Sequence, residues 1–232
     1  MTTIAHNLQQ VHARIAAACV AAHRGVEAVT LLAVSKTFGA DAVRQAHAAG
    51  QRDFGENYVQ EAIDKIASLA DLPLVWHCIG PLQGNKTRLV AEQFDWVHSI
   101  DRLKIAERLS AQRPANRPPL NVCIQVNIDG GAHKSGVAVP EAAALAHAVA
   151  GLPRLRLRGL MTIPEIAPDF EAFFRVHASA RALFDQLRQA HRDMDTLSMG
   201  MSADLESAIA AGSTMVRVGT AIFGSRAVRS AV

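Results

Sequence analysis

Strand and helix signals alternate along almost the whole chain, and this alternation restricts the possible folds more than any other feature. Short runs of aliphatic and β-branched residues are separated by segments whose apolar residues recur at helical spacing. Strict alternation predicts parallel strands joined by right-handed crossovers. About eight such units favour a closed barrel. An open doubly wound sheet is the alternative.

The expected elements begin with a helix over about residues 4–23. Strands are expected over residues 29–35, 52–56, 74–79, 96–99, 120–127, 155–162, 196–199 and 214–218. Helices are expected over residues 40–49, 59–69, 86–92, 102–112, 140–150, 170–191 and 203–211. No linker, charge block or low-complexity segment divides the chain. We therefore predict an α/β protein, a single (β/α)8 TIM barrel with an extra N-terminal helix, formed by one domain over residues 1–232.

Composition excludes several classes of function. The 232 residues carry 24 basic and 21 acidic side chains, a surplus too small to indicate binding to nucleic acid or membrane surfaces. No uncharged apolar run approaches the ~20 residues needed to span a bilayer, and the N-terminus does not resemble a signal peptide. These features predict a soluble, cytoplasmic protein.

The reactive side chains do not form a recognisable metal or nucleophile motif. The three cysteines, Cys19, Cys78 and Cys123, are widely spaced and make no CxxC pair, so we expect reduced, buried thiols. No group of His, Cys or carboxylate residues has metal-site spacing. A Ser-His-Asp hydrolase would need a G-x-S-x-G elbow, which the chain lacks.

Two cations stand at the ends of the first and last predicted strands. In a parallel barrel ligand sites lie at the carboxyl ends of the strands, and the first and last strands are neighbours. The first strand ends in Lys36, which shares the inward face with Val34, and the last carries Arg217. A charged side chain placed there is costly unless it is paired or used. The alternatives are a solvated lysine and a structural ion pair for Arg217.

A phosphate site is expected beside this lysine. Gly219 and Thr220 follow the last strand and can offer backbone N–H groups, while Ser202 precedes a predicted helix as its N-cap, with Asp204 in the first turn. Ser202 could equally be a helix cap and nothing more. An imine-forming lysine next to a phosphate site suits an aldehyde-bearing phosphate ester, and pyridoxal 5′-phosphate (PLP) is the obvious candidate. His77, at another strand end, is either a base or a packed core histidine.

Several segments, spread in order over nearly the whole chain, carry a family resemblance. They cover residues 33–37 (AVSKT), 54–61 (FGENYVQE), 76–77 (WH), 79–83 (IGPLQ), 85–86 (NK), 134–136 (KSG), 157–161 (LRGLM), 197–202 (LSMGMS) and 216–224 (VRVGTAIFG). With them the chain resembles the pyridoxal-phosphate homeostasis protein family, which shares its barrel with the N-terminal domain of alanine racemases.

The resemblance implies a role for each matching residue. Lys36 is expected to form the internal aldimine with PLP, and Arg217 to face the pyridine nitrogen. The other cofactor-binding residues expected are Asn57, Met201, Ser202, Gly219 and Thr220. The chain departs from the family pattern at Phe38-Gly39, where a second lysine and a proline usually follow Ser-Lys-Thr. An auxiliary role of that second lysine in cofactor exchange therefore has no residue here.

The expected function is to hold and buffer PLP within the cell, with little or no catalytic turnover. Arginine stays protonated and does not readily give its proton to the ring nitrogen, and a neutral pyridine is the weaker electron sink. Racemases with this barrel use a tyrosine base from a second domain, whereas this chain ends with the barrel and has only Tyr58. We expect a monomer that is not an enzyme and that passes cofactor to apo PLP-dependent enzymes. The alternatives are an amino-acid racemase or lyase, and a Schiff-base aldolase, which would not use Arg217.

Overall fold

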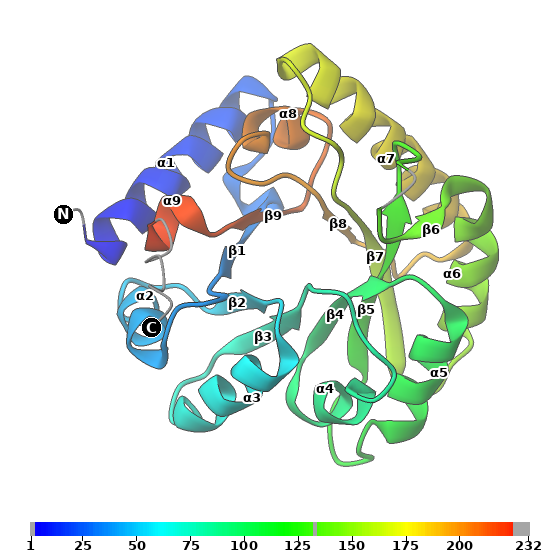
Figure 1. Cartoon of the computed structure of the whole chain (residues 1–232). Helices are drawn as coiled ribbons and strands as arrows, with labels where there is room; N and C mark the ends of the chain where they lie inside the picture. Colours follow the sequence, from blue (N-terminus) through cyan, green and yellow to red (C-terminus); the bar gives the residue numbers. More distant parts are fainter. Residues whose placement is uncertain (1–2, 132–133, 225–232) are drawn as a thin grey trace, which may run out of the picture.

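Parallel strands close into a barrel in the computed structural model, which describes residues 3–131 and 134–224 (Figure 1). Within these residues eight strands form the closed ring, in the order β4-β3-β2-β1-β9-β8-β7-β5, and β4 pairs with β5. The ring strands are β1 (Thr30–Val34), β2 (Asp53–Glu56), β3 (Val75–Cys78), β4 (Trp96–Ile100), β5 (Leu120–Asn127), β7 (Leu155–Thr162), β8 (Thr196–Ser198) and β9 (Met215–Val218). The predicted (β/α)8 barrel is confirmed.

Helices surround the ring of strands (Figure 1). They are α1 (Ile4–Ala21), α2 (Ala40–Ala48), α3 (Val59–Ser68), α4 (Thr87–Gln93), α5 (Leu103–Gln112), α6 (Ala142–Ala150), α7 (Phe170–Ala190), α8 (Leu205–Ala210) and α9 (Thr220–Phe223). Two 3₁₀ turns, η1 (Val26–Ala28) and η2 (Val139–Glu141), precede β1 and α6, and a two-residue strand, β6 (Val137–Ala138), pairs with the end of β5.

The first and last strands lie side by side, as closure of a parallel barrel requires. Strand β1 pairs with β9 in the register Leu32↔Arg217, and with β2 on its other edge in the register Ala33↔Phe54. Ligand sites in this architecture lie at the carboxyl ends of the strands. The pairing therefore brings the residues that follow Val34 and those that follow Val218 to one corner of the barrel.

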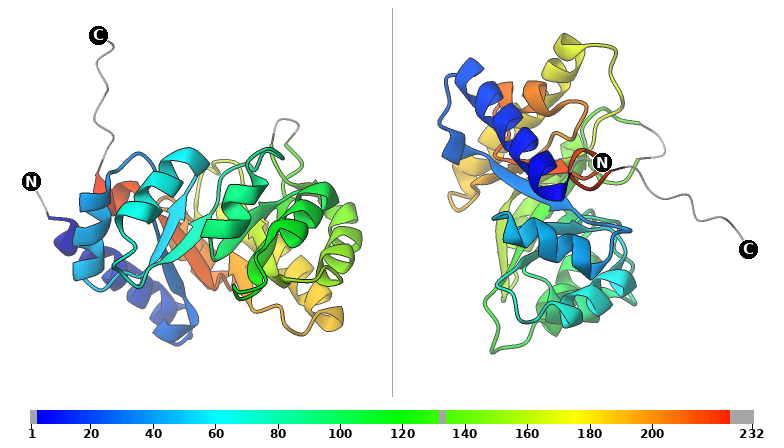
Figure 2. Two further views of the ribbon diagram at one scale, coloured as in Figure 1. Left: turned by 90° about the horizontal axis from the view of Figure 1, so that it is seen from below. Right: turned by 90° about the vertical axis from the view of Figure 1, so that its left-hand side faces the viewer.

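The extra helix α1 lies against the outside of this corner. Its stripe of Leu8, Val11 and Ile15 is buried, because these residues recur at helical spacing and face the barrel. The helix lies beside α8 and α9 in Figure 1 and beside α8 in the right-hand view of Figure 2. The predicted N-terminal helix thus supports the segments that follow β8 and β9.

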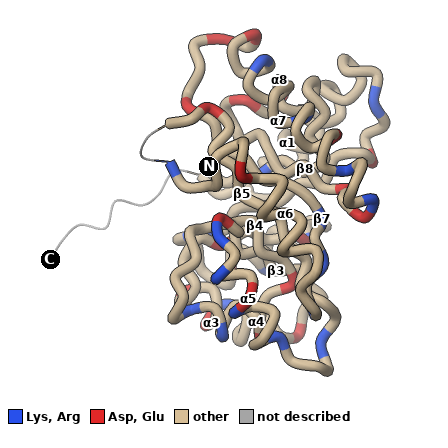
Figure 3. Tube along the Cα trace, turned by 90° about the vertical axis from the view of Figure 1, so that its right-hand side faces the viewer, with Lys and Arg blue, Asp and Glu red and all other residues tan. Residues whose placement is uncertain are grey.

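The buried residues fall into two regions. A large apolar cluster, which includes Phe94, Leu109 and Leu160, fills the layer between the strands and the helices. A small cluster of Trp96, Cys123 and Met161 lies on the inward face of the strands. Lys, Arg, Asp and Glu are interspersed over the outer elements (Figure 3), and no described helix is long and apolar enough to cross a membrane.

Differences from the sequence-based prediction gather at the ends of β8 and β9. Helix α8 begins at Leu205, not at residue 203, and the short helix α9 was not predicted at all. Its four residues are too few to show helical periodicity, so no element was predicted there. The two-residue β6 and the turn η1 were missed for the same reason.

Candidate functional site

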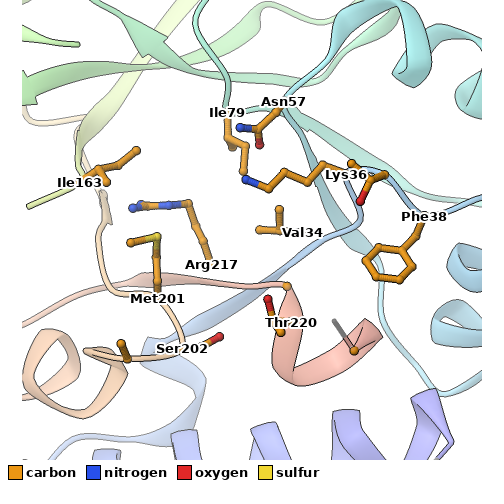
Figure 4. A pocket seen from close by; sticks show the side chains of 14 residues that line it. Val34, Lys36, Phe38, Asn57, Ile79, Ile163, Met201, Ser202, Arg217 and Thr220 are labelled. Atoms are coloured by element: carbon orange, nitrogen blue, oxygen red, sulfur yellow. The ribbon is translucent and has the colours of Figure 1, made fainter. Parts of the chain in front are cut away.

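A pocket of about 340 Å³ opens at the carboxyl ends of the strands (Figure 4). Its lining comes from segments that are far apart in the sequence and that follow β1, β2, β3, β7, β8 and β9. All seven residues predicted to bind a cofactor lie in this lining: Lys36, Asn57, Met201, Ser202, Arg217, Gly219 and Thr220. The structure therefore brings the predicted set together, although their binding role stays a prediction.

Lys36 extends into the pocket from the loop that follows β1 (Figure 4). The next residue, Thr37, has φ 71°, a left-handed conformation that is strained for a β-branched side chain. Its backbone N–H donates to Glu61 Oε1 of α3 at 2.8 Å, which holds the unusual conformation. The turn at Thr37 thus fixes the direction in which the chain leaves Lys36.

A buried ion pair lies on the other side of this loop. Lys65 Nζ donates to Glu56 Oε1 at 2.6 Å and to the Ser35 carbonyl oxygen at 2.9 Å, and the Ser35 hydroxyl donates to the same Glu56 oxygen at 2.6 Å. The Lys65 and Glu56 side chains are 4% and 0% exposed. Burial raises the pKa of Glu56, and the nearby charge and hydrogen bonds of Lys65 oppose that rise. The network ties β1, β2 and α3 together beneath Lys36.

Arg217 points from β9 into the pocket and is held by two hydrogen bonds (Figure 4). Its Nη1 donates to Ser198 Oγ and its Nη2 to the Thr162 carbonyl oxygen, both at 2.8 Å. Burial lowers the pKa of Arg217 to about 10, so the guanidinium remains charged at neutral pH. Arginine has five N–H donors, and the described residues engage two of them, which leaves others for a ligand in the pocket.

The turn after β9 offers backbone donors to the pocket. Gly219 is the N-cap of α9, and its carbonyl oxygen accepts from the Ile222 and Phe223 N–H groups at 2.9 and 3.0 Å, so the first-turn donors that remain for a ligand are the N–H groups of Thr220 and Ala221. A Cβ atom at Gly219 would lie 3.1 Å from the Val34 carbonyl oxygen and 3.4 Å from the Val34 Cβ. Glycine is needed here because β1 and the turn approach closely, and this places the donors next to the base of the Lys36 loop.

The second predicted arm, at Ser202, differs from the prediction. Ser202 is not the N-cap of α8; that position is held by Asp204, and residues 202–204 form a turn. Asp204 Oδ1 accepts the Met201 N–H at 2.6 Å, and Oδ2 accepts from His177 Nε2 at 2.9 Å. These bonds close the turn before the helix begins, and this is why the helix starts at Leu205.

The Asp204 carboxylate therefore lies beneath the turn and supports it. Burial by itself raises the pKa of Asp204, but the hydrogen bonds from His177 and the Met201 N–H outweigh burial and lower it. Both oxygens of Asp204 are engaged by donors within the protein, His177 Nε2 and the Met201 N–H.

The remaining predicted residues lie on the opposite walls. Asn57, after β2, has a buried Oδ1 atom without a hydrogen-bond partner in the described structure. Met201 is 37% exposed at the rim. His77 is fully buried inside the barrel and does not contribute to the lining. Sequence reasoning missed the apolar lining residues Val34, Phe38, Ile79, Ile163 and Ala203, because apolar residues at strand ends look like ordinary core.

Lys36 and Arg217 are the titratable side chains among the described lining residues. No His, Tyr, Cys, Asp or Glu of the described ranges lines the pocket. Tyr58 is 53% exposed at the start of α3. The three cysteines are buried and unpaired, with burial raising the pKa of Cys78 and Cys123 to about 12, and residues 3–131 and 134–224 hold no group of side chains suited to a metal ion.

Comparison with known proteins decides the family. Residues 1–227 match the family model of the alanine racemase N-terminal domain. The pyridoxal phosphate homeostasis protein of Pseudomonas aeruginosa is 61% identical over 97% of this chain and 97% of its own length. The chain belongs to this family. The pyridoxal phosphate homeostasis protein of Escherichia coli K12 is 57% identical over 97% of this chain and 98% of its own length.

A solved structure of the same family has a bound cofactor. PipY of Synechococcus elongatus, solved with PLP bound, superposes with a TM-score of 0.84 at 38% identity and covers 96% of this chain and 100% of its own. The family resemblance inferred from the motifs is therefore confirmed, and the barrel of this chain matches that of a family member.

Proposed function

We propose that this chain binds PLP in the pocket at the carboxyl ends of the strands and takes part in PLP homeostasis. The observation that carries the proposal is the convergence of Lys36, Arg217 and the donor turn at Gly219 and Thr220 on one cavity. The homeostasis proteins that resemble the chain over nearly its full length, and PipY with its bound PLP, support the same cofactor.

The residues present fit the cofactor. Three N–H groups of Arg217 and the buried Asn57 Oδ1 lack protein partners in the described structure, and the turn at Gly219 offers backbone donors. When bound, PLP supplies an aldehyde carbon that a lysine amine can hold as a Schiff base. We assign Lys36 to that carbon and Arg217 to the pyridine nitrogen.

The phosphate is assigned to the two turns beneath Lys36. The hydroxyl groups of Thr220 and Ser202 face the same part of the pocket (Figure 4), and the backbone N–H of Thr220 lies at the start of the turn that carries one of them. Gly219 permits the close approach of this turn, and Met201 covers the rim. Donors on two separate turns can surround an anion from two sides, which a single turn cannot do.

The lining supports a carrier in preference to a catalyst. Racemisation needs an acid–base group on each face of the substrate, and the described lining holds no titratable side chain besides Lys36 and Arg217. A permanently protonated arginine at the ring nitrogen also makes the ring a weaker electron sink. The alternative function, a PLP-dependent racemase or lyase, would have to bring Tyr58 or another group to the pocket.

The domain extent, oligomeric state, location and partner enzymes of the protein stay predictions. We propose that residues 1–232 act as one PLP-binding barrel domain, that the protein is a cytoplasmic monomer, and that apo PLP-dependent enzymes receive cofactor from it. A transfer assay tests the last point: holo-protein mixed with an apo-enzyme should restore that enzyme's activity faster than the cofactor's release into solution allows.

Borohydride reduction of the PLP-loaded protein tests the binding site directly. Mass spectrometry should place the reduced adduct on Lys36, and Lys36→Ala should abolish the adduct while the protein stays folded. Lys104→Ala, which removes an exposed lysine of α5, is the matched control and should load like the wild type. An adduct on Lys134 or Lys86 alone would contradict the assignment.

Turnover assays separate the carrier from the racemase. Loss of one acid–base group typically costs ~10²–10⁴ in rate, so alanine and serine should be turned over hardly at all. A racemisation kcat in the ordinary enzyme range of ~1–10³ s⁻¹ would favour the alternative.

A further inference from the structure

A chain of buried polar side chains runs through the barrel interior from the pocket to the opposite end of the strands. Arg217 Nη1 lies 2.8 Å from Ser198 Oγ, which lies 3.0 Å from His98 Nδ1. His98 Nε2 lies 3.0 Å from His77 Nδ1, and His77 Nε2 lies 3.1 Å from Asp53 Oδ1. These residues come from β9, β8, β4, β3 and β2. The two imidazoles and the serine are fully buried.

The chemistry of the two ends favours one direction for the hydrogen bonds in between. A guanidinium can only donate and a carboxylate can only accept. Ser198 Oγ therefore accepts from Arg217 and has its own O–H to give to His98 Nδ1. His98 must then carry its proton on Nε2 and donate to His77 Nδ1, and His77 donates from Nε2 to Asp53.

The opposite order leaves groups without partners. If His98 carried its proton on Nδ1, the Ser198 O–H would have no acceptor among these five side chains. His77 would then donate from Nδ1 and turn the lone pair of Nε2 toward the Asp53 carboxylate. An unsatisfied buried polar group and a lone pair facing an anion are both costly, so the first order is the stable one.

His98 stays neutral in this environment, as the order requires. Burial lowers its pKa well below the ordinary value for histidine, and His77 and the positive charge of Arg217 lower it further. A neutral imidazole donates through one nitrogen and accepts through the other. Each link of the chain thus has one donor and one acceptor.

We propose that Ser198 and His98 are positioning residues that aim the Arg217 guanidinium at the ring of the bound cofactor, with the tautomers held in order by His77 and Asp53. This role rests on the proposed function, because it concerns Arg217 as the partner of the pyridine nitrogen. Nη2 is held separately by the Thr162 carbonyl oxygen, so Ser198 sets the second point that fixes the plane of the guanidinium. His98 holds Ser198 in the rotamer that accepts from Arg217.

Nitrogen NMR of the protein without cofactor tests the direction of the hydrogen bonds through His98 and His77. We expect the His98 ring to carry its proton on Nε2 and not on Nδ1, and the His77 ring to accept at Nδ1 and donate from Nε2. A proton on Nδ1 of His98, or a charged His98, would overturn the proposed order. This measurement does not depend on PLP binding or on any substitution.

Substitutions test the positioning role through PLP affinity and the absorbance of the bound cofactor. Ser198→Ala should weaken PLP binding about 3- to 10-fold, the usual effect of losing one hydrogen bond, and shift the absorbance maximum. The matched control is Ser213→Ala, which removes another fully buried hydroxyl, one whose nearest acceptor is the Met199 carbonyl oxygen at 2.7 Å. The control should bind PLP like the wild type.

A pair of substitutions at His98 separates positioning from packing. His98→Asn keeps an amide group near the former Nδ1 and should retain most of the PLP affinity, whereas His98→Ala should resemble Ser198→Ala. Equal PLP affinity and absorbance in Ser198→Ala and Ser213→Ala would overturn the positioning role. If the wild-type protein does not bind PLP, the proposed function fails together with this role, while the tautomers of the two histidines remain a separate result.

Discussion

The inside of the barrel and the layer between strands and helices bury different kinds of side chain. The outer layer packs apolar side chains such as Leu109 and Phe94 between strands and helices. The interior carries polar groups from Arg217 to His77, with a small apolar cluster around Trp96. Close-packed apolar burial supplies most of the stability of a domain, so we expect stability to depend on the outer layer and ligand binding on the interior.

The buried pair Lys65–Glu56 is a charged exception in this apolar layer, and it should show the largest stability effect. Lys65→Met leaves the Glu56 carboxylate buried without its 2.6 Å partner, and loss of one partner of a buried pair typically costs about 3–5 kcal/mol. Urea denaturation would measure this. Lys65→Met combined with Glu56→Gln should recover much of the loss, and a double variant no more stable than the single one would contradict this account.

Leu109→Ala tests the apolar part of the same layer. Leu109 is fully buried on α5, and the substitution should lower the free energy of unfolding by about 2–5 kcal/mol. PLP affinity of the folded variant should not change. The control is Leu103→Ala on the same helix, where the side chain is 37% exposed and the cost should be about 0.5 kcal/mol or less. Weaker PLP binding in Leu109→Ala would contradict the assignment of ligand binding to the barrel interior alone.

Gly219→Ala should reverse the pattern, with an effect on binding larger than that on stability. The added Cβ would press against the Val34 carbonyl oxygen at 3.1 Å, and overpacking of this kind costs about 1–3 kcal/mol. Movement of the turn would displace the donors assigned to phosphate, so PLP titration should show reduced affinity. Gly39→Ala, where the added Cβ meets no atom within 4 Å, is the control.

Most of the fold could be predicted because hydrophobic periodicity is a local signal. Every ring strand and each of the longer helices lies within two residues of its predicted bounds, apart from the first turn of α6, which is a 3₁₀ turn. Helix α9 has too few residues to show a period. The shifted start of α8 depends on His177, which comes from a different helix and reaches Asp204 through the fold.

The site was predictable where a residue type is unusual for its position. A lysine directly after β1 and an arginine within β9 stand out against apolar neighbours. The polar chain behind Arg217 does not stand out, because His77, His98 and Ser198 each look like an isolated polar residue in a strand. Only closure of the barrel brings them within hydrogen-bond distance, and Ser198 and His98 are 100 residues apart.

A smaller effect is expected from Asp204, and it should depend on pH. The pKa of Asp204 is lowered in the folded protein, so its stabilising contribution is complete above its unfolded value of ~3.9 and is lost as pH falls through the folded value. Asp204→Asn should cost about 1–2 kcal/mol at neutral pH. Below about pH 4 the difference from wild type should shrink. Urea denaturation at several pH values would measure it, and a difference that grows in acid would contradict the assignment.

The smallest expected effect lies at the far end of the polar chain. Asp53 is 28% exposed, so water can accept from His77 when Asp53→Asn removes the charge, and three more links separate His77 from Arg217. PLP affinity should therefore change by less than about twofold, against about 3- to 10-fold for Ser198→Ala. Asp195→Asn, at the same end of the barrel but paired with Arg158, is the control. If Asp53→Asn weakens PLP binding as much as Ser198→Ala while Asp195→Asn does not, the orientation of Arg217 is set along the whole barrel and not by its immediate neighbours alone.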